Sequence, residues 1–274
     1  MQPVVTTSAA LAELGAHLEA FEAIGLDTEF LRERTYRAEL CLVQVSATSE
    51  ASCVDPLALT DLAPLARVLT APGIIKVMHA SRQDIEVLLP VTGLVRPVFD
   101  TQVAAALAGL PAQVGYAELV RRLIGPELAK THTRTDWSRR PLSPEQIEYA
   151  LDDVRHLLPL KSLLEEQLQS LGRLEWLAEE LAALADAGSF TTEPEQAWQR
   201  IKGLRGLDDE RLRLAQQLAA WRERRASGRN RPRGWILDDT ALREIVLRVP
   251  RSAQELSAIA EVPAGVVKHC GDEL

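Results

Sequence analysis

AIGLDTEF, residues 23 to 30, is a short apolar run that contains two acidic residues, Asp27 and Glu29. The pattern predicts a β-strand, in which residues two apart project from the same side, so the two acids project together. The intervening positions face the other way: Leu26, Thr28 and Phe30. Two neighbouring carboxylates repel each other unless a cation or a shared proton offsets their charge. The run therefore indicates either a cation-binding strand or a half-exposed strand whose acids are solvated.

The segments around this run predict a mixed α/β sheet. ELCLVQVS (39–46) and ASCVDP (51–56) follow too closely for helical crossovers, so the three strands should pair antiparallel. Beyond them strands and helices alternate, which favours a mixed sheet with helices packed on it. The expected elements are a strand at IIKVMH (74–79), a helix at SRQDIEVLL (81–89), a short strand VFD (98–100), and helices starting near Thr101 and Tyr116.

Several helix boundaries are marked by capping residues. Thr7 or Ser8 can cap an N-terminal helix, and Ser143 is followed by Pro and, at the third helical position, by Gln. Pro159 should kink or divide the helix that starts there, because it has no backbone N–H. The following amphipathic pattern predicts a single helix over about residues 160–186.

A change in composition separates two domains. Residues 186–196, DAGSFTTEPEQ, combine Gly, Ser, Thr and Pro and resemble a linker. From Gln196 onwards the pattern is wholly helical, with starts at Asp208, Asp238 and Ser252. We therefore expect an α/β domain over residues 1–186, a linker over 187–200 and an all-α domain over 201–274.

The composition is that of a globular, cytoplasmic protein. The chain has 274 residues, 46% of them hydrophobic and only 4% aromatic. No run approaches the roughly 20 apolar residues of a membrane span, and the N-terminus lacks a signal-peptide pattern. The three cysteines lie far apart in sequence and are expected to be buried, reduced thiols: Cys41, Cys53 and Cys270.

The net charge of −8 is unevenly distributed. Residues 201–274 carry 14 Lys and Arg against 11 Asp and Glu, which leaves 17 against 28 in residues 1–200. Six Arg and one Glu lie within residues 222–233. This basic segment is either a phosphate contact or a solvated loop, whereas the acidic first domain would repel phosphate unless cations screened its acids.

Two further acidic positions lie where α/β sheets place functional sites. Asp84 follows the 74–79 strand at the start of a helix, where it could also simply complement the helix dipole. In EYALDDVRHLL, Tyr149 and Asp153 are four residues apart and share a helix face, and Asp152 lies about 100° away. The alternative is a partly buried Tyr beside an acidic surface residue.

These oxygen ligands indicate a particular class of metal ion. Carboxylates without a Cys pair and with few His residues suit Mg²⁺ or Mn²⁺ better than zinc. Two such ions about 4 Å apart can hydrolyse a phosphodiester, since one activates water and the other stabilises the leaving oxygen.

Four motifs in this order resemble those of the DEDD 3′-to-5′ exonucleases: LDTEF, HASRQDIEVL, FDT and YALDDV. The Tyr before the last Asp is typical of the DEDDy subgroup, the family of bacterial ribonuclease D. THTRTDWSRRPLSPEQIEYALDDVRHLLPL (131–160) is the stretch most similar to that family. The resemblance covers essentially the whole chain and implies an RNase-H-like exonuclease domain.

The resemblance also implies a role for five residues. Asp27, Glu29, Asp84 and Asp153 match the family's metal-binding acids, and Tyr149 matches the Tyr that orients the attacking water. Asp152 is adjacent, but the family spacing selects Asp153.

The same resemblance, together with position, indicates candidate substrate contacts. His79 and Gln83 lie near the second motif, and Phe30 lies beside the first. The alternatives are a structural role for His79 and core packing for Phe30. Residues just before the catalytic helix could touch phosphates or a terminal base, although packing and salt bridges are equally expected of them: Arg134, Trp137, Arg139 and Arg140.

Residues 207–250 resemble an HRDC domain, the helical module that follows the nuclease in this family. Trp221 and Trp235 are expected in its core. Its last helix begins only around Val266, so we expect either a truncated chain or a full protein that continues beyond it.

We therefore expect a metal-dependent 3′-5′ exoribonuclease that releases 5′-monophosphates from single-stranded 3′ ends. The resemblance implies tRNA precursors and other small stable RNAs as substrates. Two alternatives remain open: a DNA 3′-5′ exonuclease with the same acids, and a non-catalytic nucleic-acid-binding adaptor.

Overall fold

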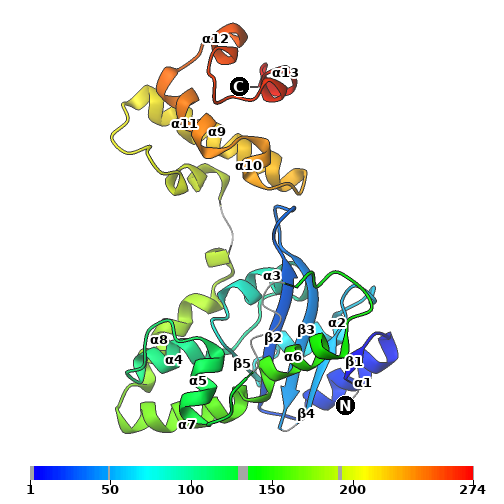
Figure 1. The fold of residues 1–274 in the computed structure, drawn as a ribbon. Coiled ribbons are helices and arrows are strands. Elements are labelled where there is room, and N and C mark those ends of the chain that lie inside the picture. The colour runs from blue at the N-terminus through cyan, green and yellow to red at the C-terminus, as the bar shows by residue number, and fades with distance from the viewer. Residues whose placement is uncertain (1–2, 49, 129–134, 191–192, 274) are drawn as a thin grey trace. The chain divides into compact units, whose positions relative to one another are not determined.

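A computed structural model describes residues 3–48, 50–128, 135–190 and 193–273 (Figure 1). The chain divides into two compact units. The first contains residues 1–31 and 39–190, and the second contains residues 32–38 and 191–274.

The described part of the first unit contains one mixed sheet of six strands in the order β1-β4-β3-β2-β5-β6. β2, β3 and β4 pair antiparallel, as predicted, whereas β1 is parallel to β4, and β5 is parallel to both β2 and β6. The strands are β1 Val4–Val5, β2 Ala23–Leu31, β3 Glu39–Ala47, β4 Glu50–Val54, β5 Ile75–Met78 and β6 Val98–Asp100. The predicted mixed α/β architecture is confirmed.

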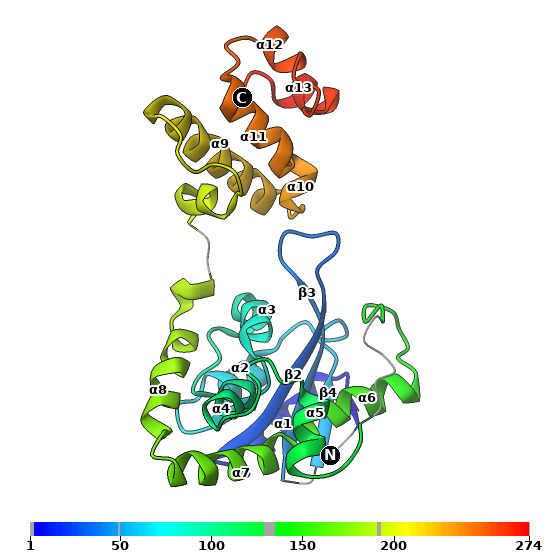
Figure 2. The same ribbon diagram turned by 60° about the vertical axis from the view of Figure 1, so that its left-hand side comes forward.

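The helices of this unit pack on the sheet and on one another (Figures 1 and 2). They are α1 Ser8–Leu18, α2 Ala63–Thr70, α3 Arg82–Thr92, α4 Thr101–Leu107, α5 Tyr116–Leu123, α6 Pro144–Arg155, α7 Leu157–Ser170 and α8 Leu174–Ala182, followed by the 3₁₀ segments η1 Ala183–Ala185 and η2 Ala187–Phe190. α6 contacts β2, β3 and β4, α7 contacts β2 and β5, and α3 contacts β2 and β3. β2, the strand that carries the paired acids, is therefore contacted by all three of these helices.

The predicted helix starts are observed with their caps. Thr7 accepts a hydrogen bond from the Ala10 N–H, and Ser143 forms a complete capping box with Gln146. The division at Pro159 is also observed, since α6 ends at Arg155 and α7 begins at Leu157.

The prediction of one helix over residues 160–186 is wrong. α7 ends at Ser170 and α8 begins at Leu174. Gly172, between them, has φ of +67°, a left-handed conformation that terminates helices and that glycine adopts without steric cost.

The second unit is helical and has its own core. Its elements are η3 Pro194–Arg200, α9 Asp209–Gly228, α10 Arg233–Ile236, α11 Asp239–Arg248, α12 Ala253–Ser257 and α13 Ala264–Cys270. Asp208, Asp238 and Ser252 cap α9, α11 and α12, as predicted. Leu218, Leu242 and Ile245 are among the side chains buried between these helices.

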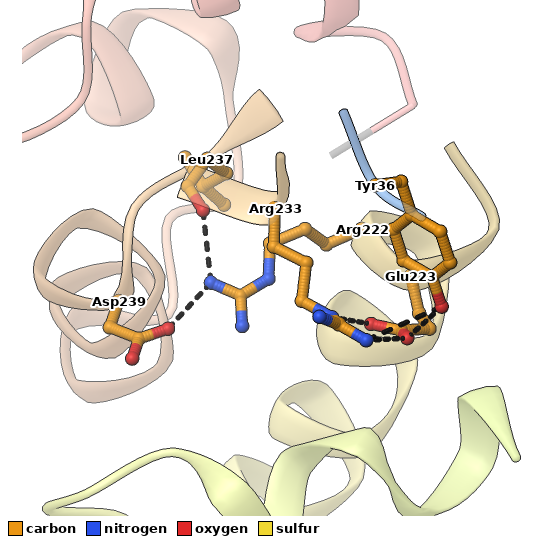
Figure 3. Close-up of polar contacts among 6 residues, drawn as sticks. All are labelled: Tyr36, Arg222, Glu223, Arg233, Leu237 and Asp239. Atoms are coloured by element: carbon orange, nitrogen blue, oxygen red, sulfur yellow. Dashed lines mark hydrogen bonds and ion pairs between the residues drawn. The ribbon is translucent and has the colours of Figure 1, made fainter. Parts of the chain in front are cut away.

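Two buried charged residues of α9 each have an oppositely charged partner within this unit (Figure 3). Glu223 is 2% exposed and accepts hydrogen bonds from Arg233 (2.5 and 2.6 Å) and from the Tyr36 hydroxyl. Arg222 is 4% exposed and donates to the Leu237 carbonyl (2.9 Å) and the Asp239 carboxylate (2.7 Å). Partners of this kind offset the cost of burying a charge.

The two tryptophans of this unit differ. Trp221 packs against the core, as predicted, and its indole N–H donates to Glu273 at 2.7 Å. The prediction that Trp235 lies in the core is wrong, because its side chain is 57% exposed and the Arg231 guanidinium lies 5.8 Å from its ring centre.

All three cysteines are buried and free, as predicted. A search of the helices in the described ranges finds none with the length and apolar character of a membrane span.

Candidate active site

β2 carries the two paired acids at a position where the sheet is irregular. Asp27 lies opposite Gln44 of β3, and Glu29 lies opposite Leu42. The register shifts directly after Glu29, so that Phe30 pairs with Leu40. On the other side of β2, pairing with β5 ends at Gly25. The acids therefore lie on a segment of β2 that has lost its β5 neighbour.

α3 brings Asp84 to this segment. Asp84 is 8% exposed and accepts a hydrogen bond from the Thr28 hydroxyl at 2.5 Å. The turn before α3 is held by Asp100, whose carboxylate accepts hydrogen bonds from the Ala80 N–H (3.1 Å) and from the Ser81 N–H and hydroxyl (both 2.8 Å). Asp100 also caps α4. One carboxylate thus fixes the loop from which Asp84 projects.

α6 supplies Tyr149 and Asp153. The Tyr149 ring lies 6.1 Å from the ring of Trp137, which is 4% exposed and packs against the same helix. Asp152, the neighbouring acid, is paired with Arg155 at 2.5 Å. The two adjacent aspartates therefore have different surroundings, and only Asp153 interacts with the acids of β2.

The four carboxylates lie within electrostatic reach of one another. Burial and the charges of Asp84, Asp153 and Glu29 raise the pKa of Asp27 well above its usual range. Burial, together with Asp153 and Asp84, raises the pKa of Glu29 to about 8. Burial is also the main reason why the pKa of Asp84 rises to about 6 and that of Asp153 to about 7. Tyr149 belongs to the same group, because burial and then Asp153, Glu29 and Asp27 raise the pKa of its phenol.

The donor set fits a hard divalent cation in its chemistry. Carboxylate oxygens are the ligands that Mg²⁺ and Mn²⁺ prefer, and a bound cation would offset the burial and the repulsion that raise these pKa values. Among the described residues, no three His, Cys, Asp or Glu side chains are gathered closely enough to share one ion. The carboxylates would therefore have to draw together around it, and Asp84 already has one oxygen engaged by Thr28.

The candidate substrate contacts are found in varied surroundings. Both ring nitrogens of His79 have partners, the Thr101 hydroxyl (2.9 Å) and the Val114 carbonyl (3.0 Å), which favours a structural role over the predicted substrate contact. The burial of Trp137 likewise corresponds to packing, which was the alternative to contact with a terminal base. Gln83 is exposed, Phe30 is half-buried, and Arg134 lies outside the described residues.

The two arginines before α6 also differ from each other. Arg139 is exposed and pairs with Asp136 at 3.1 Å. Arg140 donates to both oxygens of Asp55 (2.6 and 2.8 Å) and to three backbone carbonyls. The alternative of a salt bridge therefore describes both arginines, and the Arg140 guanidinium also connects the segment before α6 to β3.

Sequence reasoning missed two polar neighbours of the acids. Strand alternation placed Thr28 on the face opposite Asp27, yet its hydroxyl reaches Asp84 past the end of the β2–β5 pairing. Gln44, directly across from Asp27, is fully buried, and neither of its amide atoms has a hydrogen-bond partner among the described residues. Residues paired across two strands share a face of the sheet, so the register of β2 with β3 is the feature that could have identified Gln44 as a neighbour of Asp27.

Comparison with known proteins identifies both parts of the chain. A family model described as 3′-5′ exonuclease matches residues 2–169, and the HRDC domain model matches residues 211–274. A ribonuclease D from Acidiphilium cryptum is 45% identical over 267 residues, which cover 96% of this chain and 68% of the relative.

Two solved structures extend the comparison. The crystal structure of Escherichia coli RNase D, described as an exoribonuclease involved in structured RNA processing, superposes with a TM-score of 0.92 at 35% identity. The match covers 98% of this chain and 72% of the Escherichia coli chain. Brucella melitensis NrnC with bound Mg²⁺ has a TM-score of 0.55 at 30% identity, covering 60% of this chain and 82% of its own. The chain belongs to the ribonuclease D family of 3′-5′ exoribonucleases and carries an HRDC domain after its exonuclease domain.

Proposed function

We propose that this exoribonuclease hydrolyses RNA with two divalent ions, Mg²⁺ or Mn²⁺, and releases nucleoside 5′-monophosphates. The observation that carries the proposal is electrostatic. Burial, together with the charges of Asp84 on α3 and Asp153 on α6, raises the pKa of both acids on β2, an arrangement that costs stability unless cations bind to it. Mg²⁺ bound to Brucella melitensis NrnC supports the same class of ion.

The residues that would hold the ions are Asp27, Glu29, Asp84 and Asp153. When bound, two ions activate a water and stabilise the leaving 3′ oxygen of the preceding nucleotide. Tyr149 lies one helical turn before Asp153, and its raised pKa keeps the phenol protonated at neutral pH. A protonated phenol can donate to a carboxylate and accept from a water, so Tyr149 orients the attacking water and does not remove its proton.

We propose tRNA precursors and other small structured RNAs with a single-stranded 3′ end as the substrates. The support is the description of Escherichia coli RNase D as an enzyme of structured RNA processing, together with the match over 98% of this chain. Phe30, Gln83 and Arg139 are the proposed substrate contacts, since Gln83 and Arg139 are exposed and Phe30 is half-buried.

We also propose a contact with RNA in the second unit. Four arginines of the basic segment 222–233 already have carboxylate partners: Arg222, Arg224, Arg225 and Arg233. Arg231 instead lies over the ring of Trp235, an exposed side chain. An exposed indole beside a guanidinium can stack on a base and bind a phosphate, in a manner that tolerates any sequence.

The test uses RNA and DNA oligomers of matched sequence, each with a free or a blocked 3′ end. We expect 5′-monophosphates from unblocked RNA in the presence of Mg²⁺ or Mn²⁺, and no product with a chelator or from blocked RNA. Equal or faster degradation of DNA would instead indicate a DNA exonuclease.

Asp27→Asn is the companion variant. We expect it to bind RNA like the parent chain and to lose hydrolysis. If the parent chain also fails to release nucleotides with either metal while binding RNA equally well, the non-catalytic adaptor is the better description.

A further inference from the structure

The helix that carries Asp153 is broken two residues after it. His156, between α6 and α7, has φ of −101° and ψ of 0°. Pro159 has no N–H to donate to the Arg155 carbonyl, and its ring excludes that carbonyl from the ordinary helical position. Backbone groups around Asp153 therefore need partners from outside the helix.

Tyr116, the first residue of α5, supplies one such partner. In an uninterrupted helix the His156 N–H would donate to the Asp152 carbonyl. Here the Tyr116 hydroxyl lies between them. It accepts from the His156 N–H (3.2 Å), which also donates to the Val154 carbonyl, and it donates to the Asp152 carbonyl (3.1 Å). The hydroxyl is thus inserted into the hydrogen-bond ladder next to Asp153.

Ser46 of β3 supplies the other. Its hydroxyl donates to the Val154 carbonyl at 2.8 Å. Gly25 makes this approach possible, because a Cβ there would lie 2.2 Å from the Ser46 Oγ and 3.0 Å from the Val154 carbonyl oxygen. The carbonyls of the residues before and after Asp153 therefore each accept a hydrogen bond from a hydroxyl on a different element.

The Tyr116 ring is itself held in place. It packs against the core that contains Leu157 and Leu160. The His79 ring meets it edge to face at 5.7 Å, and both nitrogens of His79 are occupied. Burial raises the pKa of Tyr116, so its hydroxyl remains a donor at neutral pH. Neither hydroxyl touches a carboxylate of the site in these contacts, so any influence on the site acts through the backbone of Asp153.

We propose that Tyr116 and Ser46 are positioning residues that hold the Asp153 backbone, and hence its carboxylate, in the orientation that binds a divalent cation. This inference rests on the proposed role of Asp153 as a metal ligand. The alternative is that the two hydroxyls only satisfy the interrupted ladder and stabilise the fold.

The test compares Tyr116→Phe, Ser46→Ala and the double variant with the parent in the full chain. The measurements are Mn²⁺ affinity without RNA, kcat and KM on an RNA oligomer, and melting temperature. Removing an outer partner of a metal ligand typically costs about 10-fold in metal affinity or activity. We therefore expect an about 10-fold weaker Kd for Mn²⁺ and a similar loss of kcat in each single variant, with little change in KM.

Thr92→Val is the matched control. It also deletes a buried hydroxyl that donates to a helix carbonyl, that of Leu88 at 3.1 Å, but none of the four carboxylates lies beside this carbonyl. We expect it to lower the melting temperature and to leave the Mn²⁺ affinity unchanged. If the test variants behave in the same way, the hydroxyls are structural and the proposal is wrong. Tyr116→Phe keeps the ring and decides the question alone if the Ser46 variants do not fold.

Asp153→Asn separates this inference from the proposed function. If that variant binds Mn²⁺ and degrades RNA like the parent, the assignment of Asp153 fails and the positioning role fails with it. If Asp153→Asn loses Mn²⁺ binding but the hydroxyl variants retain it, only the positioning role is overturned.

Discussion

Tyr149 shows how one side chain can be assigned a chemical role from its surroundings. Its phenol is partly buried beside three carboxylates, so it stays protonated, whereas a catalytic base would have to be ionised. Tyr149→Phe keeps the ring packing against Trp137 and removes only the hydroxyl. We expect kcat to fall about 100-fold with little change in Mn²⁺ affinity. Single-turnover kinetics and calorimetry measure the two quantities, and Tyr36→Phe, in the second unit, should leave both unchanged.

The carboxylate group should also leave a signature in the pH dependence of stability. The ordinary carboxyl pKa is about 4, whereas Asp84, Asp153 and Glu29 titrate near 6, 7 and 8 in the folded chain. Because these values are raised, their contribution to stability is complete below about pH 4 and is lost as the pH rises through the folded values. With a chelator present, the melting temperature should therefore decrease as the pH is raised from mildly acidic values to pH 8.

Two comparisons isolate this effect from other titrating groups. Mg²⁺ should restore the melting temperature most strongly at the alkaline end, where the carboxylates are ionised. Glu29→Gln should flatten the profile relative to the parent chain. A parent profile that rises with pH in chelator, or that Glu29→Gln does not change, would contradict the electrostatic description of the site.

The residues of the candidate site were predictable to different degrees. Asp27 and Glu29 are visible from strand alternation, and Tyr149 and Asp153 from helical spacing, because both periods are local properties of the chain. The bond from Thr28 to Asp84 spans 56 positions and depends on where β5 stops pairing with β2. Local patterns contain no information on that end point, so alternation alone could not indicate the bond from Thr28 to Asp84.

At the scale of elements, helix starts were more predictable than helix ends. Ser143, Asp208 and Asp238 each accept a hydrogen bond from the backbone N–H of the third residue of their helix, so the capping residue and the group it binds lie within one turn. The break between α7 and α8 was missed because the apolar spacing continues on both sides of Gly172. The left-handed conformation of Gly172 ends the helix, and the spacing of apolar residues does not reveal it.

The contact between β2 and the α6–α7 junction yields a prediction on packing. Gly25→Ala would place a methyl group 2.2 Å from the Ser46 Oγ, closer than side chains tolerate. We expect a loss of about 1–3 kcal/mol in the free energy of unfolding, as for other overpacked sites. Chemical denaturation measures the change. Gly73→Ala is the control, because a Cβ there meets no atom within 4 Å, and an equal loss in both variants would contradict close packing at Gly25.

At the scale of the whole molecule, a count of charges overstated the basic character of the second unit. Residues 222–233 have a large positive excess in sequence, but carboxylates outside that segment pair with three of its arginines: Glu195, Asp239 and Glu273. Glu223, within the segment, pairs with Arg233. Residues 32–38 belong to the same compact unit although they lie between β2 and β3 along the chain. Both features depend on contacts between distant positions, which composition and local pattern cannot reveal.

The last prediction concerns how the intact chain binds RNA. If Arg231 and Trp235 contact the strand, Arg231→Ala should weaken binding and reduce the slope of log Kd against log salt concentration by about one. Trp235→Ala should weaken binding about 10-fold. Fluorescence anisotropy over a range of salt concentrations measures both effects. Neither variant should change the hydrolysis of a dinucleotide, which is too short to extend beyond the carboxylate site. Arg224→Ala is the matched control, because Arg224 is already paired with Glu195. Equal losses of affinity in Arg224→Ala and Arg231→Ala would show that only net charge matters, and would exclude a contact built around Trp235.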